Sequence, residues 1–146
     1  MKKHEFKVQI NAPSERVWDI LWNDVSYPQW ASAFAEGSKA ETDWKEGSKV
    51  LFHDGKGQGM VSIIAKKKPN EFMSFKHIGT ANNGVEDFDS AQSKEWAGAM
   101  ENYTLKAING KTQLTVEMDI AEEYQDYFMK TWPLAMEKIK ELAEHS

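Results

Sequence analysis

The fold of this chain is decided by its last long stretch, EEYQDYFMKTWPLAMEKIKELAEH, which spans residues 122–145. Apolar side chains recur there at steps of three and four, with charged ones between them, a pattern typical of an amphipathic α-helix. The apolar positions are Tyr124, Tyr127, Phe128, Thr131, Trp132, Ala135, Ile139 and Leu142. Such a helix is about 36 Å long at about 1.5 Å per residue, so it can cross a small domain. We expect a sheet to cover its apolar face.

The residues that precede this helix alternate between polar and apolar side chains, which predicts strands. We expect strands at residues 4–10, 49–54, 60–66, 71–79, 100–108 and 112–120. The pair Asn109-Gly110 is a strong signal for a two-residue hairpin, and Pro69-Asn70 predicts another turn. Hairpin connections imply an antiparallel sheet with one apolar face. Residues 80–94 show no such period, so we expect a long irregular, acidic segment there.

Two short helices are expected between the first strand and the rest of the sheet. Pro13 suits a first helical turn, and Val17 and Leu21 follow at helical spacing. A second short helix is expected around Trp30, whose large ring would anchor it. The chain is therefore predicted to be one α+β domain, residues 1–146, in the order strand, two helices, strands and long helix.

The composition excludes several functions. The net charge is −5 and no stripe of arginine and lysine offsets it, so a nucleic-acid partner is not expected. The absence of cysteine excludes disulfides and thiol chemistry. The chain has no signal-peptide pattern and no apolar run of about 18 residues, so we expect a cytoplasmic protein without membrane insertion. Its 6 tryptophans, 7 phenylalanines and 4 tyrosines indicate a wide interior built from large rings.

Several short motifs occur in an order that is shared with a known superfamily. They are Asn11-Ala12-Pro13 before Val17-Trp18, then Trp30, then Trp44-x-x-Gly47 ahead of a strand, and finally Trp132 with Leu134, Ile139 and Leu142. This order resembles the START-related SRPBCC superfamily, and within it the branch of homologues of the activator of heat-shock-protein ATPase. The resemblance implies a helix-grip fold, in which a curved antiparallel sheet of about six to seven strands wraps around the long C-terminal helix. Two short helices then close one end of a cavity.

Two polar residues share the apolar side of their strands. His77 has the same parity as Met73, and Glu101 has the same parity as Tyr103 and Leu105. A buried carboxylate near a histidine could orient a hydroxyl or carbonyl of a ligand, or act as a general base. Alternatively, both residues lie at strand ends, hydrated or bonded to each other, and only shape the rim of the cavity.

Aromatic and sulfur-containing side chains complete the predicted binding site. The resemblance makes the long helix one wall of the cavity, so Phe128 and Trp132 either line a pocket or fill the core, whereas Trp18 is assigned to the core. The predicted ligand-binding residues are His77, Glu101, Phe75, Tyr103, Met118, Phe128 and Trp132.

Neither a metal nor a cofactor is expected. The four histidines form no His-x-x-x-His pair, and Asp87-x-Asp89 lacks the spaced oxygen ligands of a calcium loop. The stretch Gly55-x-Gly57-x-Gly59 lies between two predicted strands, so it is a hairpin turn and not a phosphate-binding loop.

Three functions are compatible with these features, because members of the superfamily include lipid carriers, metabolite binders, cyclases and co-chaperone domains. The first is a binding module whose internal cavity holds a small hydrophobic or aromatic molecule, such as a lipid or a metabolite. The second is a co-chaperone-like interaction module with a protein partner. The third is an enzyme of the cyclase or dehydratase type, in which His77 or Glu101 moves a proton. The aromatic surplus and the one-sided sheet favour the first.

Overall fold

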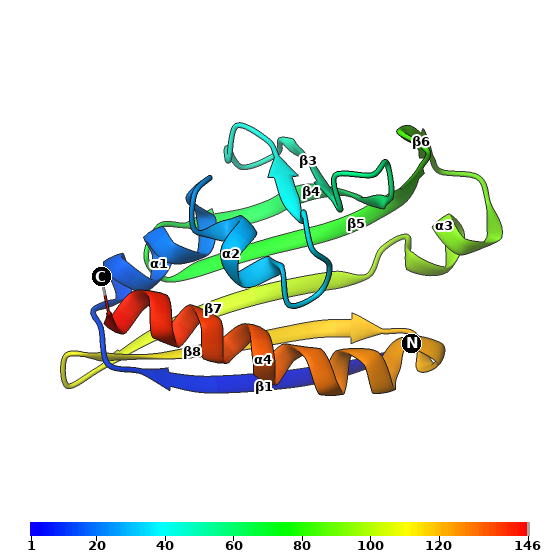
Figure 1. Ribbon diagram of the computed structural model, residues 1–146. Helices are drawn as coiled ribbons and strands as arrows, with labels where there is room; N and C mark the ends of the chain where they lie inside the picture. Colours follow the sequence, from blue (N-terminus) through cyan, green and yellow to red (C-terminus); the bar gives the residue numbers. More distant parts are fainter. Residues whose placement is uncertain (146) are drawn as a thin grey trace.

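The computed structural model describes residues 1–145 and shows an α+β fold (Figure 1). Its elements are β1 (Lys2–Ile10), α1 (Ser14–Trp22), α2 (Tyr27–Ala31), β2 (Lys39–Glu41), β3 (Lys49–His53), β4 (Gly59–Lys68), β5 (Phe72–Asn82), β6 (Val85–Asp87), α3 (Ala91–Trp96), β7 (Met100–Ile108), β8 (Lys111–Ile120), a 3₁₀ turn (Glu122–Tyr124) and α4 (Gln125–Glu144). The predicted helix-grip fold is confirmed: two short helices follow the first strand, and the long C-terminal helix lies across the sheet.

The sheet is antiparallel throughout, with the strand order β1-β8-β7-β5-β4-β3-β2 and with β6 paired to β5. The six strands expected from the alternating pattern are all present. The two additional strands, β2 and β6, have 3 residues each, which is too few to show a period of two. At the β7–β8 hairpin, Asn109 and Gly110 have φ of 51° and 80°, as the predicted two-residue turn requires.

The prediction of a long irregular segment at residues 80–94 is wrong. Strand β5 continues to Asn82, a tight turn at Asn83 and Gly84 leads into β6, and α3 follows. Both turn residues have positive φ, 51° and 78°, so this is a second Asn-Gly hairpin. The Ser90 side chain accepts a hydrogen bond from the backbone N–H of Ser93 at 3.1 Å and thereby caps α3.

The core lies between the inner face of the sheet and α4. Alternate residues of β8 are buried as predicted, because Leu114, Val116, Met118 and Ile120 face the helix. Helix α4 runs in front of β8 and β1, with α1 and α2 on its other flank and α3 toward the opposite end of the sheet (Figure 1).

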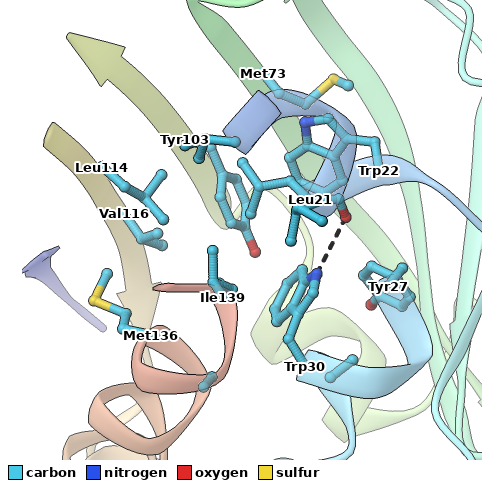
Figure 2. Packing of buried hydrophobic residues seen from close by; sticks show 14 of the residues in the cluster. Leu21, Trp22, Tyr27, Trp30, Met73, Tyr103, Leu114, Val116, Met136 and Ile139 are labelled. Carbon is cyan, nitrogen blue, oxygen red and sulfur yellow. Dashed lines mark hydrogen bonds between the residues drawn. The ribbon is translucent and has the colours of Figure 1, made fainter. Parts of the chain in front are cut away.

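The two halves of α4 cover different interiors, which we call the closed end and the open end. At the closed end, the C-terminal half of α4 buries Ala135, Met136, Ile139 and Ala143. Figure 2 shows that Leu21, Leu114 and Ile139 gather around Tyr103 there, while the Trp30 indole donates a hydrogen bond of 3.3 Å to the carbonyl oxygen of Leu21. The open end is lined by Phe128 and Trp132 of the N-terminal half, by Tyr124 of the preceding 3₁₀ turn, and by Phe34 and Trp96.

Candidate ligand-binding site

A cavity of about 520 Å³ occupies the open end, between the sheet, α2, α3 and α4. Its wall is mainly aromatic and contains Tyr27, Trp30, Phe34, Phe52, Trp96, Tyr103, Tyr124, Tyr127, Phe128 and Trp132. Its polar lining residues are Ser38, Lys39, His53, Asp54, Gln58, His77, Gln92 and Glu101. Most of these polar residues lie in or next to β2, β3 and α3, whereas His77 and Glu101 belong to the central strands.

The register of the central strands brings the polar residues together. Glu101 on β7 lies directly opposite Phe75 of β5 and Met118 of β8, and His77 lies opposite Ser62 of β4. Since His77 and Phe75 are two residues apart on β5, the side chains of His77 and Glu101 are diagonal neighbours on the same face. A bulge at residue 78 follows His77 and therefore leaves the inward parity of this residue unchanged.

Glu101 is the centre of a small group of contacting polar side chains, which we call the polar group: Ser62, His77, Glu101 and Tyr103. The Tyr103 hydroxyl donates to Oε2 of Glu101, and the other carboxylate oxygen, Oε1, lies 3.4 Å from Nε2 of His77. The second ring nitrogen of His77, Nδ1, lies 2.6 Å from the Ser62 hydroxyl oxygen. The His77 side chain is 5% exposed and that of Glu101 is 16% exposed, so the carboxylate is the part of the group that is more accessible from the cavity.

The surroundings of two tyrosines keep their hydroxyls protonated. Burial, and then the negative charge of Glu101, raise the pKa of Tyr103 well above its usual value, and the hydrogen bond to Glu101 acts in the same direction. Burial and the charge of Glu101 also raise the pKa of Tyr27. Both phenols line the same cavity and keep their O–H groups at neutral pH, and that of Tyr103 donates to Glu101.

The cavity contains six of the seven residues that the sequence predicted for the site. His77, Glu101, Tyr103, Met118, Phe128 and Trp132 all line it. Phe75 does not, because its ring is fully buried in the core behind the wall, with ring centroids 5.3 Å from Trp22 and 5.1 Å from Phe52. The prediction that Trp18 belongs to the core agrees with its packing against the core cluster.

Other parts of the wall had no signal, or only a weak one, in the sequence. Phe34 lies beyond the end of α2, and Trp96 lies on the short α3 within the segment expected to be irregular. Ser62 could have been found as a polar residue inside an apolar strand. Its parity is obscured by a second register shift in β4, at residue 65.

Among residues 1–145, no group of three or more histidine, cysteine or carboxylate side chains could hold a metal ion. At the rim, Nε2 of His53 lies 3.1 Å from Oε2 of Glu41, and the Asp54 carboxylate accepts hydrogen bonds from the backbone N–H groups of Lys56 and Gln58. None of the helices described is long and apolar enough to cross a membrane.

The helix-grip fold, together with the family match given next, makes the chain a member of the SRPBCC superfamily. The chain belongs to the family described as Activator of Hsp90 ATPase homolog 1-like protein, because the sequence model of that family matches residues 11–144. No curated protein matches the chain in a sequence search.

Three solved structures illustrate how widely the fold is shared. The Aha1 dimer from Colwellia psychrerythraea has a TM-score of 0.74 and 15% identity, over 99% of this chain and 98% of that one. A protein from Mesorhizobium loti has a TM-score of 0.73 and 16% identity, over 97% and 96% of the two chains. A protein from Chromobacterium violaceum has a TM-score of 0.70 and 16% identity, over 99% and 98%. At these identities the likeness concerns the fold alone.

Proposed function

We propose that this protein binds a small hydrophobic or aromatic molecule in the cavity at the open end. The observation that carries the proposal is a cavity of about 520 Å³ whose aromatic wall surrounds the partly accessible carboxylate of Glu101. Pockets for small organic ligands commonly measure roughly 300–1,000 Å³ and combine an apolar wall with a few polar groups that fix orientation. The rings supply contact area, and the polar group supplies the orientation.

The polar group also supports a binding role because it is an unfavourable way to fill a core. A carboxylate taken out of water loses hydration that the protein must replace with hydrogen bonds. Tyr103 donates one such bond to Glu101, and a carboxylate can accept about four. Because Glu101 lines the cavity and, among residues 1–145, its Oε1 has only His77 nearby, at 3.4 Å, water or a ligand can supply further donors.

The test is saturable binding of a neutral fluorescent probe, N-phenyl-1-naphthylamine, to the purified chain. We expect its emission to rise on binding to the native protein. An Ala35→Trp variant, which fills the cavity from beside α2, should bind at least about tenfold more weakly, a loss of about 1.4 kcal/mol. The matched control is Ala107→Trp on the exposed end of β7, which should bind normally.

Equal binding by all three proteins, or no binding by the native protein, would contradict the proposal. Native mass spectrometry of the purified protein adds an independent check, because a co-purified ligand would appear as an added mass and its extraction would give its chemical class. A protein that is empty in both experiments would favour the alternative of an interaction module with a protein partner.

A second candidate function, acid–base catalysis, is supported by the polar group itself. A carboxylate, an imidazole and a phenol face one cavity, which are the groups that enzymes use to move protons. Under this hypothesis His77→Ala abolishes turnover of a cyclisation or dehydration substrate, whereas under the binding hypothesis it changes affinity alone. Native protein that binds a molecule and returns it chemically unchanged would exclude catalysis on that molecule.

A further inference from the structure

The charges around the cavity are unevenly placed. Its basic lining residues are Lys39, His53 and His77. Lys39 is exposed, and His53 already faces Glu41 at 3.1 Å. Within the part of the chain that the structure describes, His77 is therefore the only basic lining residue that lies against the Glu101 carboxylate.

The two carboxylate oxygens of Glu101 are contacted unequally. Tyr103, a neutral donor, hydrogen-bonds to Oε2. Oε1 lies 3.4 Å from Nε2 of His77, which is longer than the usual N–H···O distance, because the ring is also held at 2.6 Å by the Ser62 hydroxyl. Among the residues that the structure describes, Oε1 therefore lacks a short hydrogen bond and can accept one from a ligand in the cavity.

The aromatic wall suits a cation at this position. The faces of tryptophan, tyrosine and phenylalanine rings attract positive charge, more strongly when water is displaced. Trp96 is close to the polar group, with its ring centroid 6.4 Å from that of His77, and it continues into Phe128 at 6.5 Å. A carboxylate beside such rings offers an ammonium group both charge-assisted hydrogen bonds and cation–π contact.

We propose that the natural ligand of this cavity is an amine, with a protonated nitrogen at Glu101 and a flat or extended hydrophobic body lying against Trp96 and Phe128. This inference rests on the proposed binding function and names its ligand class. A neutral alcohol of the same shape offers Glu101 a hydrogen bond but no positive charge. A carboxylic acid of the same shape is repelled by Glu101.

The test is isothermal titration calorimetry of the full chain with three ligands of matched shape: 2-(naphthalen-2-yl)ethylamine, 2-(naphthalen-2-yl)ethanol and naphthalen-2-ylacetic acid. We expect the amine to bind at least about tenfold more tightly than the alcohol, and the acid to bind more weakly than either. Glu101→Gln keeps the size of the side chain and removes its charge. It should lower the affinity for the amine to about that of the alcohol, while the affinity for the alcohol changes by less than about threefold.

The matched control is Glu117→Gln on β8, which removes a carboxylate on the polar side of the sheet and should leave the preference for the amine intact. The ranking of the three ligands by the native protein decides the inference even if Glu101→Gln fails to fold. Alcohol or acid binding as tightly as the amine would overturn the amine inference and leave the binding function standing. Failure of all three ligands, together with failure of the neutral fluorescent probe, would overturn the binding function itself.

Discussion

The C-terminal half of α4 buries small and aliphatic side chains against the sheet, whereas the N-terminal half presents large rings to the same sheet. At the closed end, Ala135, Ile139 and Ala143 allow close packing, and these residues are at most 6% exposed. At the open end, the Phe128 and Tyr124 rings contact Trp96 of α3 and leave the cavity between them and the sheet. Side-chain size along one helix therefore separates a solid core from a binding space.

The two ends also differ in their polar chemistry. Near the closed end, the buried Thr112 side chain is neutral, and its hydroxyl donates a hydrogen bond of 2.8 Å to the carbonyl oxygen of Ala12. The open end contains the carboxylate of Glu101 and the imidazole of His77. This carboxylate and this imidazole are thus placed where they can meet water or a ligand.

The largest expected effect is on stability at the closed end. Ile139→Ala removes a fully buried side chain, and we expect the free energy of unfolding to fall by about 2–5 kcal/mol because a cavity is left behind. Urea denaturation measures this change. Leu134→Ala, on the exposed side of α4, should change the free energy of unfolding by less than about 0.5 kcal/mol. A loss of fluorescent-probe binding by folded Ile139→Ala protein would show that the two ends are not independent.

The second prediction concerns the open end, where a substitution should weaken probe binding more than it lowers stability. Phe128→Ala removes half-buried ring surface from the cavity wall, so we expect probe binding to weaken about tenfold, equivalent to about 1.4 kcal/mol. The free energy of unfolding should fall by only about 1 kcal/mol, because part of this side chain is already exposed to the cavity. Met129→Ala, at an exposed neighbouring position, should change neither quantity. A stability loss as large as that of Ile139→Ala would contradict the division of the helix into two ends.

The third prediction concerns how each half of α4 is anchored. Arg16 donates to the carbonyl oxygens of Leu142 at 3.1 Å and Ala143 at 3.4 Å, where its charge also favours the helix C-terminus. We expect Arg16→Ala to lower the free energy of unfolding by about 1 kcal/mol in urea denaturation. Tyr127→Phe removes a hydrogen bond of 2.6 Å to the carbonyl oxygen of Phe34 on the exposed side of the open end. It should lower the free energy of unfolding by about half as much, because water replaces the lost partner. The reverse ranking would place the stronger anchor at the open end.

The smallest effect is expected in alkaline solution. Folding raises the pKa of Tyr27 through burial and then through the charge of Glu101, so the folded protein holds this proton more tightly than the unfolded chain, in which tyrosine titrates near about pH 10. The stabilisation that this proton provides is therefore complete below about pH 10 and is lost as the pH rises above that value. In urea denaturation between about pH 9 and pH 11, the free energy of unfolding of Tyr27→Phe should fall less steeply than that of the native protein. Equal slopes would show that Tyr27 ionises as freely in the fold as outside it.

Much of the fold could be predicted because its signals are local. Six strands and α4 follow from hydrophobic period, and the β7–β8 hairpin follows from one Asn-Gly pair. The same Asn-Gly signal occurs at Asn83-Gly84, but β6 is too short to confirm it by alternation, so the prediction there failed.

The candidate site could be predicted only in part. Strand parity gave the inward direction of His77 and Glu101, and the structure adds their diagonal placement and the partner Ser62. Parity could not distinguish Phe75, which faces the same side but is covered by other rings, from the residues that line the cavity.

The sequence by itself therefore determined most of the elements and their order, the inward faces of β1 and β8, and the inward parity of His77 and Glu101, since these depend on residues a few positions apart. The helix-grip arrangement of these elements was implied by the resemblance to a known superfamily. Only the tertiary structure decided where the interior stays open. That outcome depends on rings from distant parts of the chain that meet around the cavity. Phe128 of α4 lies between Phe34, which follows α2, and Trp96 of α3, with ring centroids 6.1 Å and 6.5 Å away. Packing of large rings from separate elements has no period in the sequence, because it is set by the shapes of surfaces that meet only after folding.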